Sequence, residues 1–284
     1  MGKRKYYSVR TGRNPARELD LPLARRLFGS TFSELQRAGY FQESLGDYCV
    51  DYPNLLPGSV GQDIEAFFVR KLRKDSLWPI RDNFESYSED DLFDVVELLH
   101  DLVSKPLEGN HHRFGECGWH YTIFDKDEGR AYYRSQINEL LEDYGEGFEL
   151  SDEGEVLRRG VEGLHSLLEV DLPEIDAENI EERVEGAVKK FRRRQATSDD
   201  RRDAVRDVAD VLEFLRPRLS EVLASGDESD LFNIANNFGI RHHNDEQRTD
   251  YDSEVWLDSL FYYYLNMIHT VTRLLSRETV EGVE

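Results

Sequence analysis

The chain has 284 residues, of which 39% are hydrophobic and 11% aromatic, enough for the core of one large domain or two ordinary ones. Its 58 acidic and 36 basic residues leave a formal net charge of −22, so nucleic acid can bind only at a local group of basic residues. No apolar stretch is long enough for a signal peptide or a membrane span, and we expect a cytoplasmic protein without membrane contact.

The first half of the chain shows mainly helical patterns. Apolar residues recur at helical spacing in residues 24–40, 62–74, 88–103 and 130–144. Pro22 can begin the first of these helices. Ser88 can begin the third, with Asp90 and Asp91 in its first turn, where carboxylates favour the helix dipole. Gly145 ends the fourth.

Residues 109–124, GNHHRFGECGWHYTIF, mix glycine, histidine and aromatic residues without helical period and predict a loop that leads into a short extended piece. Cys117 and His120 have the spacing of metal ligands, and His111 and His112 lie just upstream. No second ligand pair is visible at a suitable distance, and aromatic-rich loops often bury such residues as packing. Cys49 is far away in the sequence, which argues against a disulfide framework. We therefore predict no metal and no other cofactor.

Two short apolar segments around a Ser-Asp-Glu-Gly turn predict a β-hairpin at residues 148–158. The linker-like stretch VDLPEIDAEN then separates an N-terminal domain, residues 1–172, from a C-terminal domain, residues 173–284. The C-terminal domain shows four helical patterns, at residues 178–194, 198–225, 228–238 and 253–277. Ser198 is the expected cap of the second and Gly239 ends the third. The predicted fold class is thus mainly α with a small β-hairpin.

Residues 189–206 are the strongest signal for nucleic-acid binding, because they hold eight basic and three acidic residues in an acidic chain. Basic side chains beside phosphates release counterions and drive salt-dependent binding. The alternative is a solvated helix junction that neutralises the protein's own acidic groups. We select as RNA-binding residues Lys189, Lys190, Arg192, Arg193, Arg194, Arg201, Arg202 and, further along, Asn244.

Residues 236–245, NNFGIRHHND, place Arg241, His242 and His243 between the third and fourth helical patterns. Cutting RNA through its own 2′-hydroxyl needs a group that moves a proton near neutral pH and a cation that stabilises the charged phosphorane. Imidazole and guanidinium serve these two roles. In the other interpretation, Arg241 caps the third helix and both histidines are solvated.

The part of the sequence around these residues resembles a known group of proteins. Residues 178–277 resemble a HEPN domain, and the phrase LFNIANNFGIRHHNDEQRTDYDSEVWLDSLFYYYLNMIHTVTRLL resembles the C-terminal modules of AbiJ-like abortive-infection proteins. The first half is similar to their N-terminal domains through GWHYTIFDKDEG and FELSDEGEV. HEPN ribonucleases carry an arginine, a polar residue and a histidine four to six positions after the arginine. Arg241 and His242 match the start of that motif, whereas residues 245–247 contain no histidine.

The resemblance implies a four-helix C-terminal domain that dimerises and acts in antiviral defence or as a toxin. Two functions stay open. One is a metal-independent endoribonuclease, with Arg241 on the scissile phosphate and His242 or His243 as proton carrier. The other is a catalytically inert HEPN-like dimer that binds RNA, nucleotide or a partner protein such as an antitoxin. Apolar residues between Trp256 and Leu275 occupy more than one helix face, which predicts a homodimer through this last helix.

Overall fold

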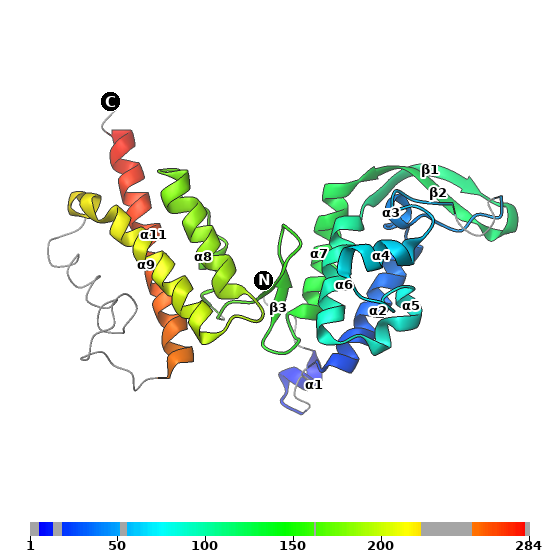
Figure 1. The fold of residues 1–284 in the computed structure, drawn as a ribbon, viewed down its shortest axis with the longest axis horizontal. Helices are drawn as coiled ribbons and strands as arrows, with labels where there is room; N and C mark the ends of the chain where they lie inside the picture. The colour runs from blue at the N-terminus through cyan, green and yellow to red at the C-terminus, as the bar shows by residue number, and fades with distance from the viewer. Residues whose placement is uncertain (1–5, 14–18, 52–55, 162, 223–251, 282–284) are drawn as a thin grey trace. The chain divides into compact units, whose positions relative to one another are not determined.

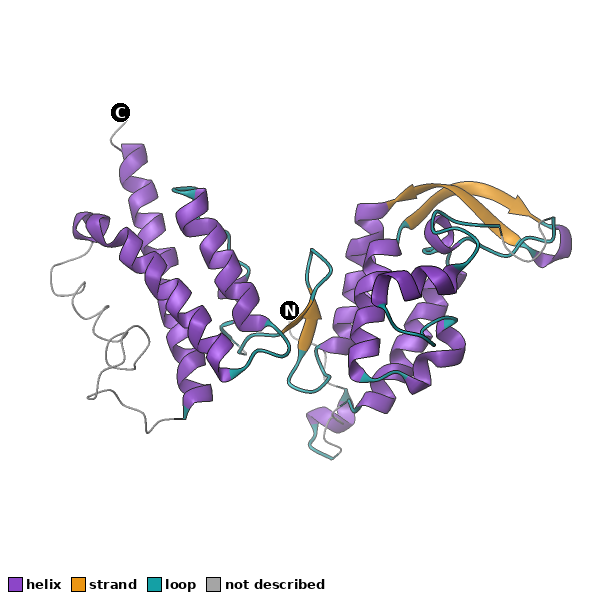
Figure 2. Cartoon of the chain, viewed as in Figure 1, coloured by secondary structure: helices purple, strands orange, loops and turns teal. Residues whose placement is uncertain are grey.

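The computed structural model describes residues 6–13, 19–51, 56–161, 163–222 and 252–281 (Figure 1). The chain divides into two compact units, Met1–Leu157 and Arg158–Glu284. This boundary lies earlier than the predicted one at residue 172, because Leu167, Leu168 and Leu172 pack against the core of the second unit. Both units are mainly helical, as the sequence predicts (Figure 2). Within the described part of the chain, none of the helices has the length and apolarity needed to cross a membrane.

The helices of the first unit confirm all four predicted segments and add shorter ones. They are α1 (Tyr7–Arg10), α2 (Leu21–Arg37), α3 (Gln42–Leu45), α4 (Ile64–Leu72), α5 (Ile80–Asn83), η1 (Phe84–Ser86), α6 (Glu89–Leu102), η2 (Phe114–Glu116) and α7 (Lys126–Leu141). Local chemistry fixes their starts. The Asp20 side chain accepts the Leu23 N–H at the start of α2, and Ser88 and Asp91 form a reciprocal capping box at the start of α6.

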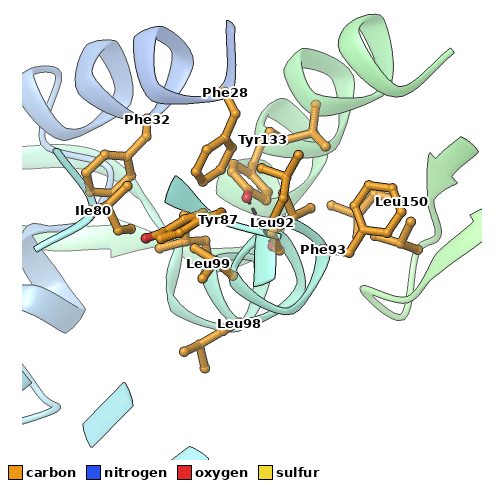
Figure 3. Close-up of a cluster of buried hydrophobic side chains, with 14 of the residues drawn as sticks. Phe28, Phe32, Ile80, Tyr87, Leu92, Phe93, Leu98, Leu99, Tyr133 and Leu150 are labelled. Atoms are coloured by element: carbon orange, nitrogen blue, oxygen red, sulfur yellow. Dashed lines mark hydrogen bonds between the residues drawn. The ribbon is translucent and has the colours of Figure 1, made fainter. Parts of the chain in front are cut away.

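The core of the first unit lies between α2, α6 and α7. Figure 3 shows Phe28 and Phe32 of α2, Leu92 and Leu99 of α6 and Tyr133 of α7 in this cluster, all of them buried. The Tyr133 hydroxyl is satisfied inside the core because it donates to the backbone carbonyl of residue 96 over 3.0 Å. This cluster also includes Phe148, Leu150 and Val156, and it contains no residue of 105–125.

The stretch predicted as a loop is an antiparallel hairpin, β1 (Lys105–His112) and β2 (Gly118–Asp125), joined by η2. The prediction was wrong over β1 because the strand lacks the alternation of apolar and polar residues that marks a half-buried strand. Its stability comes from pairing instead. The strands approach so closely that a Cβ at Gly109 would lie 2.3 Å from the His120 carbonyl oxygen. The hairpin predicted at residues 148–158 is confirmed as β3 (Phe148–Leu150) and β4 (Val156–Arg158).

The second unit contains η3 (His165–Leu168), η4 (Ala177–Glu181), α8 (Glu182–Arg192), α9 (Ser198–Val222) and α11 (Ser253–Glu281). Phe191 of α8 stacks on Phe261 of α11 with ring centroids 4.0 Å apart, at the centre of a leucine- and valine-rich core. The cap of α9 is Thr197 rather than Ser198, because the Thr197 hydroxyl accepts the Asp200 N–H over 3.1 Å. The predicted third helix, residues 228–238, lies outside the described residues.

Helix α11 buries residues on more than one face within its own unit. Eight apolar side chains of this helix belong to the core: Leu257, Leu260, Phe261, Tyr264, Leu265, Ile268, Val271 and Leu275. On another side, the Tyr262 hydroxyl accepts the Val161 backbone N–H over 3.0 Å. Much of the two-faced pattern is therefore satisfied inside the chain, and the homodimer through this helix stays a prediction.

Candidate metal centre

Four side chains of the first unit converge at the end of the β1–β2 hairpin. They are Cys49, His112, Cys117 and His120, and their ligand atoms all lie within 4.8 Å of one another. Cys49 comes from the segment after α3, His112 ends β1, Cys117 follows η2, and His120 lies in β2. Two sulfurs and two imidazole nitrogens are the donor set of a structural zinc site.

The spacing of the donors agrees with a shared zinc ion. The Cys49 Sγ atom lies 3.7 Å from His112 Nδ1. In a tetrahedral site with Zn–S near ~2.3 Å and Zn–N near ~2.0–2.1 Å, a sulfur and a nitrogen ligand stand ~3.6 Å apart. These two atoms therefore already have the separation of two ligands on one ion, and the others need only small movements.

The hairpin register puts both imidazoles on one face. Asn110 is paired with His120 across the strands, and His112 follows Asn110 by two positions. Paired residues and residues two apart share a face of a β-ladder, so His112 and His120 point to the same side. Their ring centroids are 5.8 Å apart.

The turn between the two strands places Cys117 beside the other three residues of the cluster. Gly115 and Gly118 adopt positive φ angles of 64° and 88°, which glycine accepts without strain. At Gly115 a Cβ would also lie 2.6 Å from a methyl carbon of Val50, so the turn packs directly on the segment that carries Cys49. The glycines therefore suit the turn that brings Cys117 towards Cys49.

One backbone N–H donates to the sulfur of Cys117. The Val50 N–H donates to Cys117 Sγ over 3.2 Å, so the segment that supplies one sulfur also supplies a hydrogen bond to the other. Burial raises the pKa of the Cys117 thiol, and the Val50 N–H opposes this rise. A cation in the cluster would favour the thiolate further, because metals coordinate cysteine in its deprotonated form.

The two histidines differ in their outer contacts. His112 Nε2 lies 3.5 Å from an Asp51 carboxylate oxygen, on the side of the ring away from Cys49. A carboxylate partner on the second nitrogen is the usual arrangement for a metal-bound histidine. In His120 both ring nitrogens are buried and have no hydrogen-bond partner among the described residues. Such a buried polar group costs about 1–3 kcal/mol unless it is satisfied, and a metal ion would satisfy it.

Gln42, the first residue of α3, fixes the backbone on both sides of His120. Its side chain donates to the Trp119 carbonyl over 2.8 Å and accepts the Tyr121 N–H over 3.0 Å, as a neighbouring strand would. It also donates to the Asp47 carboxylate over 2.7 Å. Burial raises the pKa of Asp47, while the nearby His120 lowers it. The strand is thus held at the position where it presents its imidazole.

Three of the four ligand residues come from the motif that the sequence analysis considered and set aside. His111 is not part of the cluster, because its exposed ring lies on the other face of β1, 5.3 Å from the Trp119 ring. Cys49 is the residue that sequence reasoning missed. Its only signal was that it is the chain's other cysteine, and its approach depends on the contacts of Gln42 and Val50. From the sequence we predicted no metal, whereas the structure brings four possible metal ligands together.

The residues selected for RNA binding are largely engaged with the protein itself. Arg192 and Arg201 are only 6% and 7% exposed, and Arg192 donates to the Arg158 carbonyl. Acidic partners lie beside Lys189, Lys190, Arg201 and Arg202, namely Glu185, Asp207, Asp258 and Asp199. Arg193 is exposed. Much of the positive charge of residues 189–206 thus neutralises the protein's own carboxylates. The predicted catalytic residues Arg241, His242 and His243, with Asn244, lie outside the described residues.

No protein-family model, curated protein or solved structure matches the chain.

Proposed function

We propose that this chain is a zinc-binding protein with Cys49, His112, Cys117 and His120 as ligands. The observation that carries the proposal is the convergence of all four donor atoms within 4.8 Å of one another. The metal is structural, because four protein ligands complete a tetrahedral shell and leave no position for water or substrate. Thiolate and imidazole donors select zinc over magnesium or calcium, which take oxygen ligands.

The ion joins the segment after α3 to the end of the hairpin. Both strands have mostly exposed or half-buried residues, so the hairpin contributes little to a hydrophobic core. Zinc binding in small domains supplies about 10–16 kcal/mol of apparent free energy. Even a fraction of that value exceeds what the pairing of a two-stranded hairpin provides, since an isolated hairpin is marginal in water. Loss of zinc therefore releases the hairpin end, while the helical core between α2, α6 and α7 stays folded.

The test is metal analysis of the purified full-length chain after reconstitution with zinc. We expect one zinc per chain in the wild type and a loss of binding in Cys49→Ser and His112→Ala. With cobalt as a probe, a tetrahedral sulfur–nitrogen site gives strong visible absorption. His111→Ala is the matched control, because it removes an imidazole from the same strand outside the cluster. A wild type without bound zinc, or a His111→Ala variant as deficient as His112→Ala, contradicts the proposal.

For the second unit we propose the RNA-directed function that the sequence resemblance implies, either cleavage or binding in antiviral defence. It is supported by α8, α9 and α11, which correspond to three of the four implied helices and share one core. In the sequence Arg241 lies between α9 and α11, where the HEPN motif is expected. The cytoplasmic location, the homodimer through α11 and an antitoxin or other protein partner belong to the same proposal.

Incubation with bulk RNA tests this second function. Arg241→Ala should abolish cutting, and one of His242→Ala and His243→Ala should lower it by about 10²–10⁴-fold while the other has little effect. A chelator would also strip the proposed zinc, so metal independence is tested with EDTA on both the wild type and His112→Ala, and both should still cut RNA. Intact RNA with the wild type, together with RNA or nucleotide binding that depends on Arg241, favours the inert alternative. If neither depends on Arg241, both interpretations fail.

A further inference from the structure

The two cysteines of the proposed site form a pair in an otherwise cysteine-free chain. Cys49 and Cys117 are the only cysteines among the 284 residues, and both are free thiols. Their Sγ atoms belong to a cluster whose ligand atoms all lie within 4.8 Å of one another. A thiol that is oxidised here has a second thiol within reach, and the chain contains no third cysteine that could compete with it.

The two sulfurs differ in access. Cys49 is buried, with 5% of its surface exposed, whereas Cys117 is half-buried in the turn between η2 and β2. Cys117 is therefore the sulfur that a small oxidant reaches first, and Cys49 is the neighbour that resolves the product. An accessible thiol beside a resolving cysteine is one part of the arrangement expected of a redox-sensitive pair.

We propose that Cys49 and Cys117 are a reversible two-electron oxidation site at which hydrogen peroxide forms a disulfide and releases the metal. The proposal rests on zinc binding at the candidate metal centre. It adds a modification site and a means of control to that centre. The co-reactant is peroxide, a small neutral oxidant that can enter where Cys117 is exposed.

The chemistry balances in two steps. The Cys117 thiolate attacks a peroxide oxygen, the O–O bond breaks, and a sulfenic acid forms while the leaving hydroxide takes up a proton to give water. The Cys49 thiolate then attacks the Cys117 sulfur, the S–O bond breaks, and the second hydroxide takes up a proton. In total, two thiolates lose two electrons to one peroxide, two protons are consumed, and two waters and one S–S bond form. The two metal–sulfur bonds are lost, and the ion leaves as Zn²⁺.

The remaining donors cannot keep the ion. After oxidation only His112 and His120 can coordinate it, and a disulfide sulfur is a far weaker ligand than a thiolate. The cross-link still joins the segment after α3 to the end of the hairpin, so the hairpin stays tethered. Thiol reductants reverse the step by attack on the disulfide, and the four donors then bind zinc again.

The experiment uses the full-length chain loaded with zinc and freed of excess metal, with the zinc content measured before oxidation. Peroxide is added in steps, and released zinc is followed with a chromophoric chelator while free thiols are counted in parallel. We expect one zinc released for each pair of thiols lost, an intact mass lower by two hydrogens, and a peptide map that joins Cys49 to Cys117. Dithiothreitol followed by zinc should restore the initial metal content.

Two controls separate this inference from the zinc proposal. His111→Ala should behave like the wild type, because that imidazole lies outside the cluster. Cys49→Ser removes the resolving thiol, so peroxide should drive Cys117 to sulfenic and then sulfinic acid, which thiol reductants do not reverse. No zinc in the unoxidised wild type contradicts the metal centre itself. Zinc that binds but stays bound while the thiols are lost, or that leaves with disulfides between chains, overturns only the redox inference.

Discussion

The Nε2 atom of His112 lies 3.5 Å from an Asp51 carboxylate oxygen, and the other ring nitrogen faces Cys49 Sγ at 3.7 Å. The imidazole thus stands between a proposed metal ligand and a carboxylate, in the orientation of a zinc-bound histidine with an outer carboxylate partner. The carboxylate stands beside the ring nitrogen that points away from Cys49, where it can hold the ring in this orientation. Asp51 and Cys49 come from the same segment, so one short stretch of chain positions both partners of the ring.

Asp51→Asn should therefore weaken zinc binding. Loss of such an outer partner costs about 10–100-fold in affinity, and we expect about tenfold because the Asp51 side chain is 67% exposed and its charge is screened. Competition with a chelator of known affinity measures the change. Glu108→Gln is the matched control, since it removes one exposed carboxylate from β1 outside the cluster. Equal weakening in both variants would mean that only net charge matters.

Gln42→Ala should loosen the hairpin. The side chain makes three hydrogen bonds, to Trp119, Tyr121 and Asp47, and its loss leaves two backbone groups of β2 without their protein partners. We expect the free energy of unfolding to fall by about 1–3 kcal/mol and the zinc affinity to fall with it, because metal binding and folding are coupled. Denaturant unfolding with and without zinc gives both values. Gln62→Ala, at an exposed position before α4, should change neither.

The helices could be predicted because their signals are local. Pro22 lies in the first turn of α2 and Ser88 caps α6, and each acts within one turn of its own position. The β1–β2 hairpin and Cys49 could not be predicted in the same way. Cys49 meets the other ligands only because Gln42 and Val50 contact residues far along the chain. Long-range pairing of this kind leaves no periodic pattern in a single sequence.

The burial of charged side chains could not be predicted from the sequence either. The sequence of residues 189–206 predicts a basic surface. Arg201 is nevertheless only 7% exposed, and its Nη2 atom lies 2.6 Å from an Asp258 carboxylate oxygen. Its guanidinium also stands 4.9 Å from the centroid of Phe191, the ring that stacks on Phe261. The ion pair joins α9 to α11, and its partner is far away in the sequence. A count of charges cannot separate such a residue from one that faces solvent.

Arg201→Ala should destabilise the second unit. The substitution removes a cation–π contact and takes the guanidinium away from a carboxylate that is only 26% exposed. Breaking a fully buried pair costs about 3–5 kcal/mol, and the partial exposure of Asp258 places our expectation near 2–3 kcal/mol. Arg202→Ala is the control, because its partner Asp199 is 89% exposed and surface pairs contribute at most about 1 kcal/mol. Denaturant unfolding at neutral pH compares the two, and equal losses would contradict a structural role for Arg201.

His100 should make the stability of the first unit fall in mild acid. This side chain at the end of α6 is 1% exposed, and neither ring nitrogen has a hydrogen-bond partner among the described residues. Burial, and then the positive charge of Arg130, lower the pKa of His100 below its ordinary value of 6.5. Asp101 and Asp152 oppose the shift, and Arg134 adds to it.

The folded state therefore keeps the ring neutral at pH values where the unfolded chain already binds a proton. Stability from this residue is complete above pH 6.5 and decreases as the pH falls below it, until the folded pKa is passed. One proton bound only by the unfolded chain changes the free energy of unfolding by up to about 1.4 kcal/mol per pH unit. His100→Leu should flatten this decrease, whereas His111→Leu, at an exposed site, should not.

Acid would also release zinc from the proposed site, because protons compete with the metal for its ligands, and this loss would hide the contribution of His100. The comparison is therefore made in a Cys49→Ser background without metal, by urea unfolding between pH 5 and pH 7.5. In that background the first unit should lose stability in acid with His100 present and much less with leucine in its place. If the free energy of unfolding decreases equally with acid in both variants, the buried His100 ring already binds a proton in the folded state. That result would contradict the lowered pKa of His100.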